Sequence, residues 1–120
     1  MKGIAIGFSD TSKEILKRLK KTEFINEIYI GSSSKKDKNI KGSIDFVRPK
    51  QILREKWDKV DLILFVGSIG ASIRLITSLL SFKDKDPGVI VIDSKGLKIV
   101  PIIGSHQSNV QNIAFQICNL

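Results

Sequence analysis

Two segments of this 120-residue chain carry residue types that suit the binding or conversion of an anionic group. The first reads Gly67-Ser68-Ile69-Gly70, and Arg74 follows one helical turn later. It leaves an apolar, strand-like run and opens a helix-like one, so its free backbone N–H groups and the helix dipole favour an anion. The Arg74 guanidinium suits a two-pronged pair with a carboxylate. A tight turn that binds nothing, with Arg74 in solvent, is the alternative that these residues leave open.

The second segment, Gly104-Ser105-His106-Gln107-Ser108-Asn109, contains the only histidine of the chain. A histidine on such a loop can exchange protons near neutral pH. Ser108 and Gln111 stand at capping-box spacing, so a structural role for the segment is the alternative. Because both segments are expected to leave strands and enter helices, we predict one shared anion-binding cleft that Arg74 and His106 face.

Other kinds of site find little support. One histidine and one cysteine, Cys118, are too few for a metal cluster or a nucleophilic triad. The first segment lacks both the Gly-Lys-Ser/Thr ending of a P-loop and the Gly-x-Gly-x-x-Gly of a dinucleotide site. We therefore expect no metal and no cofactor, and we interpret Cys118 as a packed helix residue.

The net charge of +8 favours anionic partners without choosing among them. Residues 1–60 hold 15 Lys/Arg and 8 Asp/Glu, a net +7, so most of this charge lies in the first half. Solvated helix faces and loops explain such clusters equally well. No nucleic-acid recognition module is present and aromatic residues make up 7% of the chain, so we do not expect nucleic-acid binding.

Length and hydropathy indicate one globular domain over residues 1–120, since 42% of the residues are hydrophobic. There is no apolar run of about 18 residues, and the opening residues are too short and strand-like for a signal peptide. The lone cysteine fits a reducing compartment. We therefore expect a cytoplasmic protein that does not bind a membrane.

Strands and helices alternate along the chain, which predicts an α/β three-layer sandwich with a mainly parallel sheet and one antiparallel strand pair. The run at 61–66 is almost continuously apolar and is expected to be the central strand. The antiparallel pair is predicted within 89–102, around a turn at Asp93-Ser94-Lys95-Gly96. The polar stretch from Ser32 to Lys41 is predicted to be an exposed, mobile loop. The remaining predicted strands are 3–8, 27–30 and 44–47.

Helices are predicted from apolar residues at helical spacing. The first is expected after a capping box formed by Thr11 and Glu14, and the second is expected to begin at Pro49. The apolar positions of the four helices are Ile15, Leu16 and Leu19; Ile52, Leu53 and Trp57; Ile69, Ile73, Ile76, Leu79 and Leu80; and Val110, Ile113, Ala114 and Ile117.

The order of the later segments resembles the N-terminal region of the cobalamin-biosynthesis protein G family (CbiG, cobalt-precorrin-5A hydrolase). The resemblance spans about residues 60–115 and comprises an apolar strand, the Gly67-to-Arg74 segment, Asp86-Pro87, a strand at 89–93, and Val100-Pro101 leading to His106. The chain departs from the family at Ser105, where a glycine is usual, and at 107–111, where a run of small residues is usual.

The resemblance implies a role in the anaerobic route to vitamin B12. The reaction would open the ring-A δ-lactone of cobalt-precorrin-5A and release acetaldehyde to give cobalt-precorrin-5B. The partner would be an anionic corrinoid, which is a tetrapyrrole. A further partner would be the C-terminal domain of the family, absent here, or another enzyme of the pathway. The resemblance leaves open whether this chain is active alone. A non-catalytic or regulatory module for an anionic ligand is the other function class.

In the reaction that the resemblance implies, His106 is the candidate acid/base group. Six residues are the candidate substrate-binding positions: Gly67, Ser68, Gly70, Arg74, Gly104 and Ser105.

Overall fold

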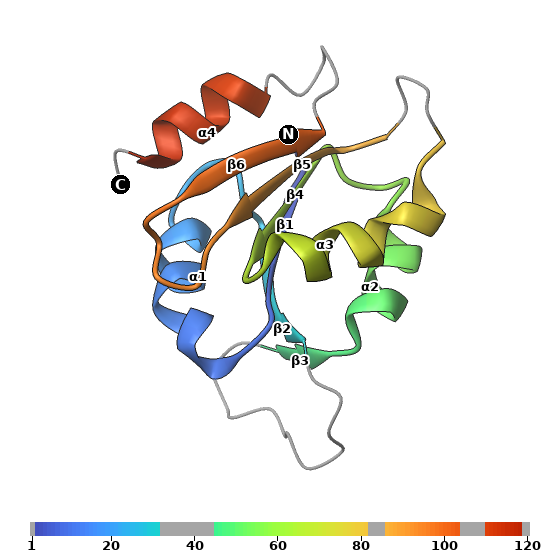
Figure 1. The fold of residues 1–120 in the computed structure, drawn as a ribbon, viewed down its shortest axis with the longest axis horizontal. Coiled ribbons are helices and arrows are strands. Elements are labelled where there is room, and N and C mark those ends of the chain that lie inside the picture. The colour runs from blue at the N-terminus through green and yellow to red at the C-terminus, as the bar shows by residue number, and fades with distance from the viewer. Residues whose placement is uncertain (1, 32–44, 82–85, 104–109, 119–120) are drawn as a thin grey trace.

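The computed structural model describes residues 2–31, 45–81, 86–103 and 110–118, and it builds them into alternating strands and helices (Figure 1). The strands are β1 (Gly3–Gly7), β2 (Glu27–Gly31), β3 (Asp45–Val47), β4 (Leu62–Val66), β5 (Gly88–Ile92) and β6 (Ile99–Ile103). The helices are α1 (Lys13–Lys20), α2 (Pro49–Lys56), α3 (Ile69–Ile76) and α4 (Val110–Cys118), with short 3₁₀ turns at Asp10–Ser12 and Thr77–Leu79. These elements confirm the predicted alternation.

The strands form one sheet in the order β3-β2-β1-β4-β5-β6. Every neighbouring pair is parallel except β5 and β6, which are antiparallel. β4 lies between β1 and β5, and its five residues are all buried. The predicted central strand and the predicted antiparallel pair are therefore both confirmed.

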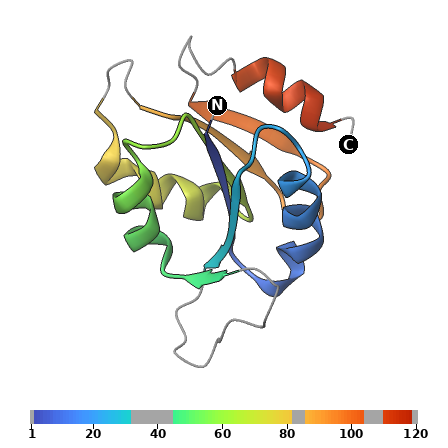
Figure 2. The same cartoon turned by 180° about the vertical axis from the view of Figure 1, so that it is seen from behind.

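Helices cover both faces of the sheet, with α1 and α4 on one side and α2 and α3 on the other (Figures 1 and 2). Successive side chains of β4 alternate between these two layers, as the period of a strand requires. Leu62, Leu64 and Val66 pack with α1 and α4, while Ile63 and Phe65 pack with α2 and α3. This double cover explains why the central strands read as continuous apolar runs.

β6 is the terminal strand of the sheet, and no described strand pairs with its outer edge. In it, Pro101 lies opposite Ile90 and is exposed. The turn before β6 is held by Asp93, whose carboxylate accepts the N–H of Leu97 at 2.7 Å and of Lys98 at 3.2 Å. Gly96 has φ +73°, a conformation that glycine adopts readily. The hairpin is thus tightly specified at its turn.

The predicted capping box of the first helix is wrong. A 3₁₀ turn precedes α1, and Ser12 occupies the N-cap position with helical backbone angles and no side-chain cap bond. The Ser12 hydroxyl instead donates to the carbonyl of Ser9 at 2.6 Å, and the Thr11 hydroxyl lies 2.6 Å from that of Ser9. The Thr11 hydroxyl, which the capping box would have required, is therefore used within the 3₁₀ turn.

Three predicted burials also need correction. Ile69 and Ile73 were expected in the apolar stripe of their helix, but they are 42% and 44% exposed. Only Ser72 and Ile76 of α3 are buried, because the short helix turns a narrow face to the sheet. Cys118 is exposed, since α4 buries Val110, Ile113, Ala114 and Ile117. The segment Ser32–Lys41 lies outside the described residues.

None of the helices in the described part of the chain combines the length and the apolar character needed to cross a membrane.

Candidate functional site

The carboxyl ends of β1 and β4 form the point at which the chain diverges to the two faces of the sheet. These strands are parallel neighbours, with Gly7 beside Val66. After β1 the chain enters α1 on one face, and after β4 it enters α3 on the other (Figures 1 and 2). In open α/β sheets, ligands bind in the crevice that such diverging loops create. This edge is therefore the candidate site.

Aromatic packing fixes the two diverging loops against each other. The Phe8 N–H donates to the carbonyl of Val66 at 3.1 Å, and the Phe8 ring stacks on Phe65 with centroids 5.6 Å apart. Gly67 has φ +154°, and a Cβ there would overlap the ring of Phe8. A glycine at 67 is thus required both by its backbone angle and by the neighbouring ring.

Ser68 is the N-cap of α3. Its hydroxyl oxygen accepts the N–H of Ala71 at 3.1 Å, and its carbonyl accepts the Ser72 hydroxyl at 2.9 Å. These bonds begin the helix immediately after the turn. The N–H groups of Ile69 and Gly70 belong to the first helical turn and have no intrahelical acceptor, so they are free to bind an anion. The Ser68 side chain acts first as a cap.

The outer face of α3 offers an open surface beside these N–H groups. A Cβ placed on Gly70 would meet no atom within 4 Å. Arg74, one turn further, is exposed, and among the described residues it forms no ion pair. Ile69 and Ile73 border the same face with nearly half of each side chain in solvent. The surface therefore combines amide donors, one guanidinium and two apolar side chains.

The second predicted segment does not leave the sheet at this edge. Gly67 follows Val66, which lies beside Ile92 at the end of β5. Because β6 is antiparallel, its last residue, Ile103, lies instead beside Val89 near the start of β5. The expectation that both loops leave one edge is wrong, for the direction of β6 reverses it. Gly104, Ser105 and His106, like the capping pair of Ser108, lie outside the described residues.

At the opposite, amino edge lies Asp86, whose carboxylate accepts several hydrogen bonds. This residue is 8% exposed. Its carboxylate accepts the indole N–H of Trp57 at 3.3 Å, the Ser81 hydroxyl at 2.9 Å and the Ser81 backbone N–H at 3.1 Å. Asp86 thus joins the end of α2 to the turn before β5. The resemblance drew attention to this position, but its hydrogen-bonding role follows only from the fold.

Electrostatic coupling at the amino edge involves Glu27, at the start of β2. The hydroxyl of Tyr29 donates to its carboxylate, and the Lys56 ammonium lies 3.5 Å away. The hydrogen bond from Tyr29, and secondarily the charge of Lys56, hold the pKa of Glu27 below its usual range. Within the described residues, no group of three or more His, Cys, Asp or Glu side chains is placed to hold a metal ion.

Sequence reasoning identified Gly67, Ser68, Gly70 and Arg74, which the structure brings together at one edge. It missed Phe8, whose ring shapes the loop at Gly67. An aromatic residue directly after a strand that neighbours the glycine turn was the available signal. Only the sheet order makes that neighbourhood visible.

The comparisons with known proteins agree with this organisation. Cobalt-precorrin-5A hydrolase from Salmonella typhimurium is 28% identical over 53 residues, and the enzyme of that name from Priestia megaterium is 30% identical over 57 residues. These alignments cover 44% and 48% of this chain, but only 15% of each relative.

A crystal structure from Sulfolobus solfataricus, described as that of a cobalamin biosynthesis protein G homolog, matches with a TM-score of 0.64 and 21% identity. The match covers 96% of this chain and 32% of the other, and it shows that the two share a fold. The family model for the cobalamin synthesis G N-terminal region matches residues 51–120, which include the whole segment from β4 through α4. The chain therefore belongs to the cobalamin synthesis G N-terminal family.

Proposed function

We propose that this chain supplies the substrate-handling N-terminal part of a cobalt-precorrin-5A hydrolase in anaerobic cobalamin biosynthesis. Water would open the ring-A δ-lactone, and a two-carbon fragment would then leave as acetaldehyde to give cobalt-precorrin-5B. The observation that carries the proposal is the family match over residues 51–120, which contains the turn at Gly67 and the exposed Arg74. The names of the two curated relatives support the reaction.

Substrate binding is proposed at the carboxyl edge. A corrinoid carries several carboxylates around an apolar macrocycle, and the outer face of α3 offers complementary groups. The N–H groups of Ile69 and Gly70 would donate hydrogen bonds to one carboxylate oxygen, and Arg74 would pair with a carboxylate. Ile69 and Ile73 would contact the apolar ring. The net charge of +8 would raise the encounter rate with such an anion.

The proposed acid/base residue is His106, with Gly104 and Ser105 as further substrate-binding residues. Because Ile103 lies at the amino edge, we treat this role separately from binding at Arg74. In this proposal, a macrocycle bound at α3 is not also bound by the segment at 104–106 of the same domain. Residues from the rest of a longer protein would then complete the site, since the aligned segments make up 15% of each curated relative.

The binding proposal is tested by titrating the purified chain with a cobalt-corrinoid precursor and recording its absorbance spectrum. Arg74→Gln should weaken binding about tenfold, the scale of one charge-assisted hydrogen bond. Arg54→Gln is the matched control, because Arg54 is an exposed arginine on α2 and has the same charge. Equal affinities of the wild type and the Arg74 variant would contradict binding at this edge.

The catalytic proposal is tested by measuring acetaldehyde release with cobalt-precorrin-5A, with and without the remainder of a longer homologous enzyme. His106→Ala should reduce turnover more than affinity, because a general acid or base acts mainly on the chemical step. Binding without acetaldehyde release under both conditions would favour the non-catalytic ligand-binding module instead.

A further inference from the structure

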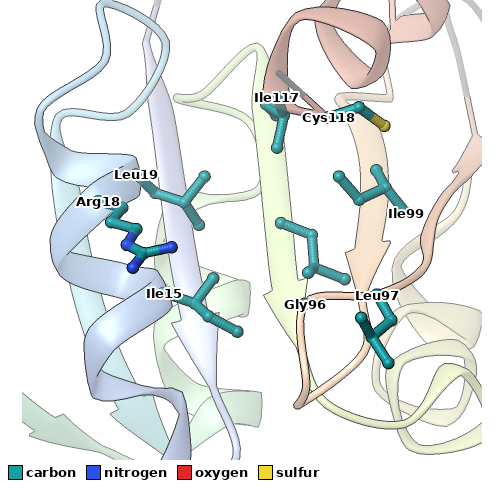
Figure 3. A pocket seen from close by; sticks show the side chains of 9 residues that line it. Ile15, Arg18, Leu19, Gly96, Leu97, Ile99, Ile117 and Cys118 are labelled. Carbon is teal, nitrogen blue, oxygen red and sulfur yellow. The ribbon is translucent and has the colours of Figure 1, made fainter. Parts of the chain in front are cut away.

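A groove between α1 and α4, on the sheet face opposite α3, remains unused by the proposed function (Figure 3). It contains a cavity of about 270 Å³. Ile15 and Leu19 line it from α1, Ile92 and Ile99 from β5 and β6, and Ile117 from α4. Figure 3 shows Ile15 and Leu19 pointing toward the side chains of β6 and α4. Most of the residues that line the cavity are thus aliphatic, and Arg18 adds a charged group.

The groove stays open because the two helices rest on different strands. α1 packs on β1 and β2, whereas α4 packs on β5 and β6, and the helices make little direct contact with each other. The hairpin turn lies at one end of the groove, with Gly96 and the 79% exposed Leu97. Exposed Cys118 lies at the other end. Among the residues that the structure describes, the groove is thus open to solvent.

Arg18 supplies the polar group of this groove. It lines the cavity and also a second hollow of about 650 Å³, which Lys21, Phe24 and Gln116 border as well. The residues that line the two hollows include these two cations, Arg18 and Lys21, and no carboxylate. Arg18 is exposed, and in the described part of the chain it forms no ion pair. The cavity therefore ends at a guanidinium that pairs with none of the described carboxylates.

We propose that the groove between α1 and α4 binds a small aliphatic carboxylate, with the apolar chain among Ile15, Leu19 and Ile117 and the carboxylate on Arg18. The volume indicates a small ligand, since pockets for small molecules typically hold about 300–1,000 Å³ and this cavity, at about 270 Å³, lies just below that range. The positive charge of Arg18 favours a carboxylate as the head group of the ligand, because a guanidinium can donate two parallel hydrogen bonds to a carboxylate. This proposal does not depend on the reaction proposed above.

The experiment uses the sodium salt of octanoic acid as the probe and the reactivity of Cys118 as the readout. Cys118 is the only cysteine of the chain, so alkylation by iodoacetamide reports on this groove alone. Octanoate, added below the concentration at which it forms micelles, should slow alkylation in a saturable manner. Octan-1-ol has the same chain without the charge and should protect at least about tenfold more weakly.

Variants locate the carboxylate. Arg18→Gln should weaken the protection by octanoate about tenfold and leave the weak effect of octan-1-ol unchanged. Arg54→Gln is the matched control and should behave as wild type, since Arg54 lies on α2 at the opposite face. Circular dichroism checks that each variant is folded.

Three results would overturn the proposal. One is the absence of saturable protection by octanoate, and another is equal protection by octanoate and octan-1-ol. The third is protection of Cys118 that rises with protein concentration without added ligand, because a second copy of the chain would then fill the groove. Each of these results leaves the Arg74 titration unaffected, so the two proposals fail independently.

Discussion

The two edges of the sheet are built in opposite ways. At the amino edge, the Asp86 carboxylate is buried and accepts several hydrogen bonds, and the Lys2 N–H donates to the Asp61 carboxylate at 2.9 Å. At the carboxyl edge, Gly70 is open to solvent and Arg74 is exposed. The Asp86 and Asp61 carboxylates are therefore hydrogen-bonded within the domain, whereas the Arg74 guanidinium at the other edge is exposed.

This difference separates two kinds of residue that a sequence resemblance treats alike. Asp86 and Arg74 both fall on segments that resemble the family, yet Asp86 joins elements of the fold, while Arg74 is exposed and forms no ion pair with a described residue. A polar side chain with all its partners inside the domain contributes to stability. A polar side chain at the diverging loops that lacks such partners among the described residues is available for a ligand. Substitutions at the two edges should accordingly change different measurable quantities.

The largest effect is expected from Asp86→Ala at the amino edge. The change leaves the Trp57 indole and the Ser81 N–H without this acceptor in a buried region, so unfolding should become easier by about 2–4 kcal/mol. Urea denaturation followed by Trp57 fluorescence measures this. Asp58→Ala removes the same charge at a neighbouring exposed position and should change stability by less than about 0.5 kcal/mol. Equal losses of stability in both variants would contradict a stabilising role for the buried Asp86 carboxylate.

A smaller loss is expected from Gly67→Ala, which requires a positive φ from alanine and pushes its Cβ into the ring of Phe8. We expect a cost of about 1–3 kcal/mol. Gly70→Ala is the paired change in the same turn. With open space around Gly70 and a helical backbone, it should raise stability by up to about 1 kcal/mol. Thermal unfolding of both variants tests whether the demand for glycine is confined to position 67.

Arg74→Gln should leave the free energy of unfolding within about 0.5 kcal/mol of wild type. The reason is that the exposed guanidinium has no ion pair among the described residues. Chemical denaturation of the variant, beside its corrinoid titration, shows whether the carboxyl edge separates binding from stability. A loss of unfolding free energy above about 1 kcal/mol would mean that Arg74 also stabilises the fold.

The smallest effect concerns pH. The Tyr29 hydroxyl, aided by Lys56, lowers the pKa of Glu27 from its ordinary value of 4.5. A lowered folded-state pKa stabilises the fold above the unfolded pKa, and this contribution is lost as the pH falls through the folded value. The stability difference between wild type and Tyr29→Phe should therefore shrink when the pH is lowered from neutrality to below 4.5. A constant difference across this range would exclude the coupling.

The sequence alone predicted the elements well where apolar runs and turn residues coincide. The continuous run at β4 correctly indicated a central strand, and the turn ending in Gly96 correctly indicated the antiparallel pair. Pro49 correctly marked the first turn of α2. These features are local, so neighbouring residues suffice to specify them.

What the sequence could not supply was the placement of one element relative to another. Helical spacing shows which side chains share a face of α3 and does not reveal how much of that face the sheet covers. Ile73 is therefore exposed although Ile76, three residues later, is buried. One error did not come from this limit: the antiparallel direction of β6 was predicted, and it already implies that the loop after Ile103 leaves the opposite edge of the sheet.

Pro101 has a consequence for association between copies of this chain. In an antiparallel ladder, hydrogen-bonded and non-hydrogen-bonded pairs alternate. The Asp93 N–H donates to the Lys98 carbonyl, so by this alternation Pro101 belongs to a pair whose backbone groups face the open edge of β6.

That edge consequently lacks a donor in the middle of a strongly apolar strand, where an incoming strand would otherwise continue the ladder. Proline at this position protects the domain against edge-to-edge polymerisation.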